Sequence, residues 1–99
     1  MLSFLPMALS LIQLRVFVTS AKCGSFTAAA RQLHMSQPTV SETIRRIEEQ
    51  YGTPLFMRGA RRLTLTTPGE ELMPLAEQTL ASADSADRAL QAVTGLQSG

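Results

Sequence analysis

Apolar residues recur at helical spacing along the start of the chain. Over residues 9–21 they fall into two rows, the first formed by Leu11, Leu14, Val18 and Ala21 and the second by Ile12 and Val16. A helix that is apolar on two sides is expected to pack between two partners. Residues 22–24 are expected to end this helix, because Gly24 readily adopts the left-handed turn that follows many helices.

A second and shorter helix is predicted over residues 26–34. Ser25 is a suitable N-cap, and one buried stripe is expected from Phe26, Ala29, Ala30 and Leu33. The helix ends at His34, which is expected to interact with the carbonyl groups of the last turn, with a phosphate contact as the alternative.

A third helix is predicted from Ser36, its N-cap, to Gly52, which ends it. Pro38 falls in the first turn, where a missing N–H costs nothing. The inner face is expected to consist of Val40, Ile44, Ile47 and Tyr51. The opposite face carries Pro38, Thr39, Glu42, Arg45, Arg46 and Glu49.

The pattern changes after the third helix. Residues 55–58 and 63–66 are short strand-like runs on either side of the sequence Gly-Ala-Arg-Arg at 59–62. This arrangement predicts a hairpin, or wing, whose loop projects Arg61 and Arg62.

A long fourth helix is predicted over residues 67–94. Thr67 is expected to be the cap, Pro68 the first helical residue and Glu70 the third, which makes a capping box. An unbroken heptad row follows, formed by Leu72, Ala76, Thr79, Ala83, Ala86, Leu90 and Val93. This row predicts a dimer interface, and the alternative is a helix that folds back on Ile12 and Val16 of its own domain.

Charge divides the chain into two parts. Residues 1–66 hold eight basic and three acidic residues, a net charge of +5, whereas residues 67–99 hold one basic and five acidic residues, a net charge of −4. A basic body beside an acidic helix indicates a polyanionic partner for the body alone. The length of 99 residues and the 44% hydrophobic content predict one small globular domain.

Several classes of function are disfavoured by composition. Cys23 and His34 are the only soft metal ligands, so neither an internal disulfide nor a zinc set is expected. No nucleophile–base pair or phosphate loop is evident, so we expect neither an enzyme nor a bound cofactor. The apolar residues 1–12 lack a basic leader and are interrupted by Pro6, so no membrane segment is expected. We interpret residues 1–8 as an extension, with Met7 a possible start, in a cytoplasmic protein.

Two short helices joined by a tight turn, the second with a polar and basic outer face, predict a helix-turn-helix. The first residues of such a second helix reach base edges in the major groove of double-stranded DNA. The predicted base-reading residues are Gln37, Pro38, Thr39, Ser41, Glu42 and Arg45. Phosphate or minor-groove contacts are predicted for Ser25, Thr27, Ser36, Arg46, Arg58, Arg61 and Arg62.

At these motifs the chain resembles the LysR-type transcriptional regulators. The resemblance runs from about Leu9 to Leu96 and rests on SFTAAARQLHMSQPTVSETIRRIEEQYG at 25–52 and PLFMRGARRLTLTTPGEEL at 54–72. It implies a mainly α fold, with a winged helix-turn-helix of three helices and a two-stranded wing at 9–66. A linker helix at 67–94 would dimerise antiparallel, and 95–99 would be a tail. In such a dimer the two recognition helices are held at a fixed spacing, so we expect a two-fold symmetric DNA site. The family's effector-binding domain is absent from this sequence, so small-molecule inducer binding is not expected here.

One residue departs from the family's pattern. The position after Ser41 is often basic or an amide in this family, whereas here it is Glu42, which can accept from cytosine N4 but cannot bond a phosphate. Glu48 and Glu49 are expected to be solvent-facing partners of the helix arginines. The competing interpretation is a dimeric protein-interaction module that does not bind DNA.

Overall fold

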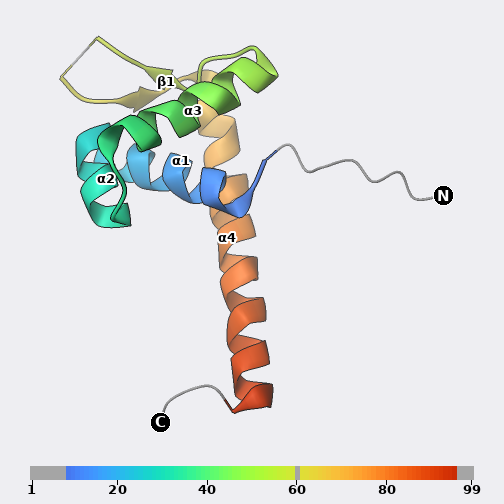
Figure 1. The fold of residues 1–99 in the computed structure, drawn as a ribbon. Coiled ribbons are helices and arrows are strands. Elements are labelled where there is room, and N and C mark those ends of the chain that lie inside the picture. Colours follow the sequence, from blue (N-terminus) through green and yellow to red (C-terminus); the bar gives the residue numbers. More distant parts are fainter. Residues whose placement is uncertain (1–8, 60, 96–99) are drawn as a thin grey trace.

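The computed structural model describes residues 9–59 and 61–95 (Figure 1). Its elements are, in order, α1 (Leu11–Cys23), α2 (Phe26–Leu33), α3 (Gln37–Tyr51), β1 (Phe56–Met57), β2 (Thr64–Leu65) and α4 (Thr67–Thr94). The two strands pair antiparallel, with Phe56 opposite Leu65 and Met57 opposite Thr64. These elements confirm a mainly α winged helix-turn-helix followed by a long helix. The predicted extension at 1–8 and residues 96–99 of the predicted tail lie outside the described residues.

Local capping explains where the first three helices begin and end. The hydroxyls of Ser25 and Ser36 accept from the backbone N–H of Ala28 and Thr39, at 3.1 and 3.2 Å. Gly24 and Gly52 adopt the left-handed conformation at φ 67° and 66° and end α1 and α3, as predicted. A complete capping box that we did not predict lies between Ser10 and Gln13 at the start of α1.

His34 ends α2, and it does so through its backbone. It is the C-cap at φ 57°, and its backbone N–H donates to the carbonyl of Arg31 at 3.3 Å. Within the part of the chain that the structure describes, none of the helices combines the length and hydropathy needed to cross a membrane.

The core surrounds the middle of α1, which packs against α2, α3 and α4. Phe17 is fully buried, and its ring lies 5.5 Å from that of Phe56 in β1. The two-sided burial expected for α1 holds for Val16 but is wrong for Ile12, which is 60% exposed in the first turn of the helix. Tyr51 was also placed wrongly on the inner face, since it is 49% exposed in the last turn of α3.

The start of α4 differs from the prediction by one residue. Thr66, not Thr67, is the N-cap, and its hydroxyl accepts from the N–H of Gly69 at 3.2 Å. The same hydroxyl donates to the carbonyl of Pro54 at 2.7 Å, so a tertiary contact selects this threonine. Glu70 is therefore the fourth helical residue, and the predicted capping box is wrong. The helix also continues through Pro74, which cannot donate to the carbonyl of Glu70.

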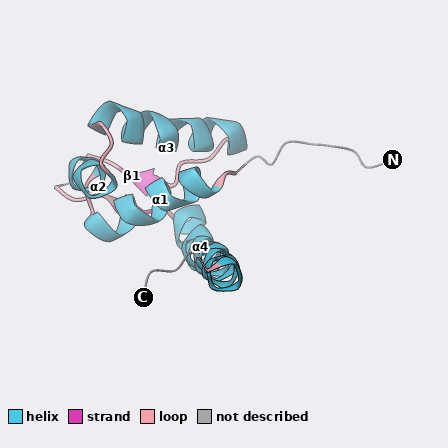
Figure 2. Cartoon of the chain, turned by 60° about the horizontal axis from the view of Figure 1, so that its bottom comes forward, coloured by secondary structure: helices cyan, strands magenta, loops and turns pink. Residues whose placement is uncertain are grey.

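The first half of α4 packs on α1, and the second half projects away from the body (Figures 1 and 2). Ala76 and Leu80 are buried, and Lys22–Glu77 and Arg15–Asp84 ion pairs, at 3.2 and 3.6 Å, flank this contact. Ala76 was predicted to lie in the dimer seam, but its side chain is 1% exposed and packs against its own domain, which leaves almost no Ala76 surface for a partner chain. The first half of α4 therefore folds back on α1, but Ile12, which the fold-back alternative named as part of the contact, is 60% exposed.

Candidate DNA-binding interface

The first turn of α3 stands free of the body. Gln37, Pro38 and Thr39 are exposed, while the inner face of the same helix is buried through Val40 and Ile44. Two contacts order this turn, one between the hydroxyls of Ser36 and Thr39 at 2.7 Å and one from the Gln37 amide to the Ser41 hydroxyl at 2.7 Å. Ser41 and Glu42 are half-buried, so these two predicted base-reading residues are less accessible than the other four.

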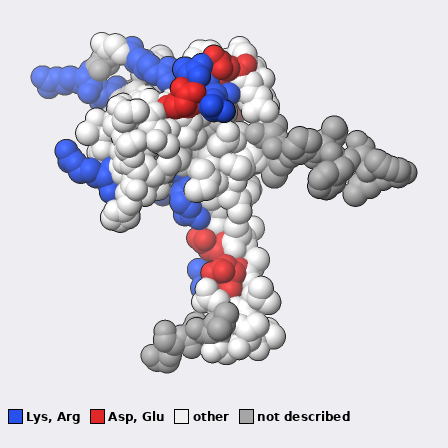
Figure 3. Space-filling view, viewed as in Figure 1, with Lys and Arg blue, Asp and Glu red and all other residues white. Residues whose placement is uncertain are grey.

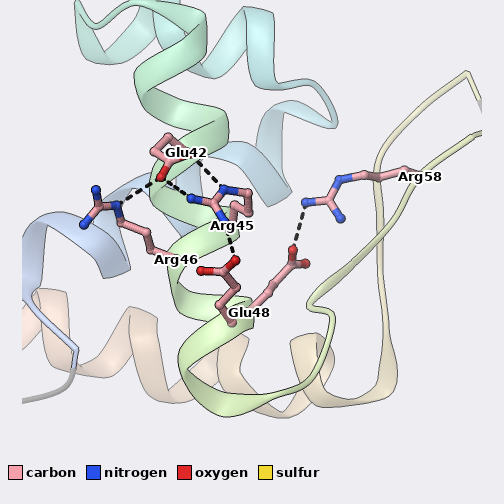
Figure 4. A network of polar contacts seen from close by, with 6 residues as sticks. Glu42, Arg45, Arg46, Glu48 and Arg58 are labelled. Carbon is pink, nitrogen blue, oxygen red and sulfur yellow. Dashed lines mark hydrogen bonds and ion pairs between the residues drawn. The ribbon is translucent and has the colours of Figure 1, made fainter.

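Glu42 joins the two arginines of α3 (Figure 4). Its carboxylate accepts from Nε of Arg45 at 2.9 Å and from Nε of Arg46 at 3.1 Å, and Arg45 also pairs with Glu49. The predicted pairing of Glu49 with an arginine is thus confirmed. These two arginines and two glutamates carry no net charge together, so the outer face of α3 is polar but close to neutral.

The arginine contacts keep Glu42 ionised. The hydrogen bond from Arg45 is the main cause that holds the pKa of Glu42 at about 2, against an ordinary value of 4.5, and it also raises the pKa of Arg45. A lowered folded-state pKa means that the pairing contributes fully above the unfolded value and is lost only as the pH falls towards about 2. The network is therefore intact at neutral pH.

Glu48 was predicted to face solvent, and this is wrong. Its side chain is 13% exposed, and its carboxylate accepts from the backbone N–H groups of Leu55 and Phe56 at 2.8 and 3.3 Å. The other carboxylate oxygen accepts from Arg58 at 3.1 Å (Figure 4). The sequence signal for this role was its place beside Ile47, on the edge of the inner face of α3.

Arg58 contacts two side chains of its own chain. Besides its bond to Glu48, its guanidinium sits over the ring of Phe26, 5.5 Å from the centroid, at the start of α2. We predicted a phosphate contact for Arg58; in the structure its side chain contacts α2 and α3 and is 45% exposed.

The two wing arginines are exposed but differ in their surroundings. The Arg62 guanidinium lies against the turn between α1 and α2, because a Cβ atom built on Gly24 would stand 2.6 Å from its Cζ. The adjacent N–H of Leu63 donates to the carbonyl of Gly24 at 3.0 Å. Arg61 is exposed at the tip of the wing, beside the residue that the structure leaves undescribed.

The predicted contact residues of α2 lie at its first turn. The hydroxyl of Ser25 is used as the helix cap, and Thr27 is exposed. In the space-filling view, blue Lys and Arg side chains gather over the wing, blue and red side chains lie together over α3, and most of the other red acidic side chains lie along α4 below (Figure 3). The basic wing is therefore separated in space from the acidic α4, while the outer face of α3 carries both signs of charge.

The arrangement suits a groove in duplex DNA. An exposed, capped helix start admits a helix to the major groove, and a neighbouring basic wing reaches the flanking backbone. Among residues 9–59 and 61–95, no group of three or more His, Cys, Asp or Glu side chains could hold a metal ion.

Comparisons with known proteins agree with this geometry. Residues 11–70 match the family described as "Bacterial regulatory helix-turn-helix protein, lysR family". The chain is 43% identical over 99 residues to the HTH-type transcriptional regulator CfxR of Cupriavidus necator, covering all of this chain and 31% of CfxR. It therefore spans about a third of that relative's length.

Two solved structures of similar fold contain DNA. The BenM DNA-binding domain in complex with catB site 1 DNA has a TM-score of 0.83 and 31% identity, covering 87% of this chain and 97% of that chain. Full-length CbnR complexed with its target DNA has a TM-score of 0.74 and 31% identity, covering 84% of this chain and 29% of that chain.

Proposed function

We propose that this chain binds double-stranded DNA as a dimer at a two-fold symmetric site. The chain belongs to the lysR family of bacterial regulatory helix-turn-helix proteins and carries their DNA-binding domain. The observation that carries the proposal is the exposed, serine-capped first turn of α3 beside a basic wing. The similar BenM and CbnR structures, both of which are complexes with DNA, support the proposal. Because chromosomal DNA is the proposed ligand, the proposed location is the cytoplasm.

We assign the contacts by position on the fold. Gln37, Pro38 and Thr39 are proposed to face base edges, with Glu42 and Arg45 beside them and Ser41 behind. Backbone or minor-groove contacts are proposed for Ser25, Thr27, Ser36, Arg46, Arg61 and Arg62. Residues 9–66 are the proposed DNA-binding unit and 67–94 the linker helix, with regulation rather than catalysis as the outcome. A small-molecule effector would bind the part of such regulators that this chain does not span.

We also propose that α4 pairs two copies antiparallel. At its start, an apolar hollow is lined by Leu9, Leu14, Leu72, Leu75, Ala76 and Thr79. At its end, Leu90 and Val93 are 65% and 83% exposed. Antiparallel pairing sets the end of one helix beside the hollow of the other, which covers both apolar surfaces.

The test is the salt dependence of DNA affinity. We expect the dimer to bind a duplex selected from a random library with a log–log salt slope of at least about −5, since each phosphate contact contributes about −0.9. Fluorescence anisotropy between low and moderate salt measures the slope. A dimer that shows no salt-dependent duplex binding would instead support the interaction-module interpretation.

Glu42→Gln is expected to raise DNA affinity and to steepen the salt slope by about 1 per subunit. The change frees Arg46 from its carboxylate partner, and one negative charge leaves a surface that faces a polyanion. Base preference should shift at one position from cytosine toward adenine, which Gln reads with two hydrogen bonds. Glu49→Gln is the matched control, because it leaves Arg46 paired with Glu42. An unchanged slope in Glu42→Gln would show that the paired arginines do not approach phosphates.

A further inference from the structure

One carboxylate connects α3 to the first strand of the wing. Glu48 has three donors within hydrogen-bond distance, two from the backbone at the start of β1 and one from Arg58 just after it. At 13% side-chain exposure, these bonds are shielded from water more than the Glu42 contacts, where the carboxylate side chain is 42% exposed. Charge-assisted bonds of this kind are stronger than neutral ones.

The connection continues from β1 to α2. The Arg58 guanidinium covers the Phe26 ring, and that ring meets Phe56 edge-on, with the centroids 5.6 Å apart. Just before the other strand, the N–H of Leu63 donates to the carbonyl of Gly24. Each side of the wing is thus hydrogen-bonded to the helix-turn-helix. The first strand is bonded through Glu48, and the segment before the second strand is bonded to the turn between α1 and α2.

We propose that Glu48 is a positioning residue, which sets the wing relative to α3 so that Arg61 meets DNA while the first turn of α3 occupies the major groove. In this assignment Glu48 and Arg58 do not contact DNA themselves. The sheet that bears the wing has only two residue pairs, Phe56–Leu65 and Met57–Thr64, so its own ladder holds it weakly. The inference rests on the proposed DNA binding.

The experiment is a double-mutant cycle between Glu48 and Arg61, read as affinity for a duplex selected by the wild-type chain. Arg61→Ala alone is expected to weaken binding about tenfold and to reduce the salt slope by about 1 per subunit. Glu48→Ala is expected to produce a similar loss of affinity. In the Glu48→Ala protein, Arg61→Ala should then weaken binding by less than about twofold. The base preference set by α3 should stay the same in all four proteins.

Two further variants separate positioning from general stability. Glu48→Gln keeps an acceptor for the backbone of β1 but loses the charge that faces Arg58, so it should recover part of the affinity and of the Arg61 effect. Glu49→Ala is the control, because Glu49 also pairs with an arginine of α3 but is 64% exposed on its outer face. It should leave the full Arg61→Ala effect in place.

Independent, multiplying losses from Glu48 and Arg61 would overturn the inference. If circular dichroism shows that Glu48→Ala does not fold, the cycle is measured with Glu48→Gln instead. In that protein too, an Arg61→Ala loss of affinity as large as in the wild type would overturn the inference. Wild-type protein that binds no duplex in a salt-dependent way would instead refute the proposed function, so the two failures are distinct.

Discussion

Gly69→Ala is expected to lower the free energy of unfolding by about 2 kcal/mol, although alanine is the better helix former. Gly69 is the third residue of α4, and its Cα lies against the backbone of the turn before β1. A Cβ atom there would fall inside contact distance of the Leu55 carbonyl oxygen and within 3.0 Å of Cδ2 of Leu65. Because the same carbonyl accepts from the N–H of Thr66 at 3.0 Å, it cannot move without loss of that bond.

Urea unfolding followed by circular dichroism measures this effect. Ala81→Gly, at an exposed position of the same helix, serves as the control for helix propensity and should cost about 1 kcal/mol. The two variants change propensity in opposite directions, yet both should destabilise. A Gly69→Ala protein as stable as the wild type would show that α4 can shift from the wing without penalty.

Much of the fold was predictable because its signals are local. The helix ends are set by contacts between residues at most four apart, as at the N-caps Ser25 and Ser36 and the C-caps Gly24 and Gly52. Such positions can be identified from sequence spacing alone. The buried stripe from Val40 to Ile47 follows in the same way from helical periodicity.

The errors arose where a distant contact decides between neighbours. Thr66 and Thr67 are equal as caps in the sequence, and the bond from Thr66 to Pro54 selects between them. Glu48 and Glu49 are likewise adjacent, yet Glu48 turns toward the wing and Glu49 toward solvent. Helical spacing places both within reach of an arginine, and it carries no information about the strand that follows.

The seam of α4 shows the same limit. The heptad row includes Ala76, but that residue packs on its own α1, while Leu75 next to it is 59% exposed and was not predicted. Because the first half of α4 packs on α1, the apolar side chain left exposed there is that of Leu75, one residue before the predicted Ala76. The surface that we propose for the dimer consists of the hollow at the start of α4, lined in part by Leu72, and five exposed residues, Leu75, Thr79, Ala86, Leu90 and Val93.

Ala86→Glu is expected to convert the proposed dimer to a monomer and to weaken binding to a two-fold symmetric duplex by about 100-fold or more. Ala86 lies on the exposed half of α4, in the row that includes Leu90 and Val93, so a carboxylate there would be buried between two helices. Ala83 was the predicted centre of the seam, but it is half-buried in its own chain, so a charge there would also disturb the monomer.

The loss should be selective for the symmetric site. A dimer binds two half-sites at once, whereas a monomer keeps only the affinity of one, so binding to a single half-site should change little. Ala92→Glu is the matched control, since it is the same substitution at an exposed position on another face of α4. Analytical ultracentrifugation and anisotropy with one-site and two-site duplexes measure both effects. A dimer that survives Ala86→Glu but is lost in Ala92→Glu would place the interface on the other face of the helix, because only a buried charge breaks the contact.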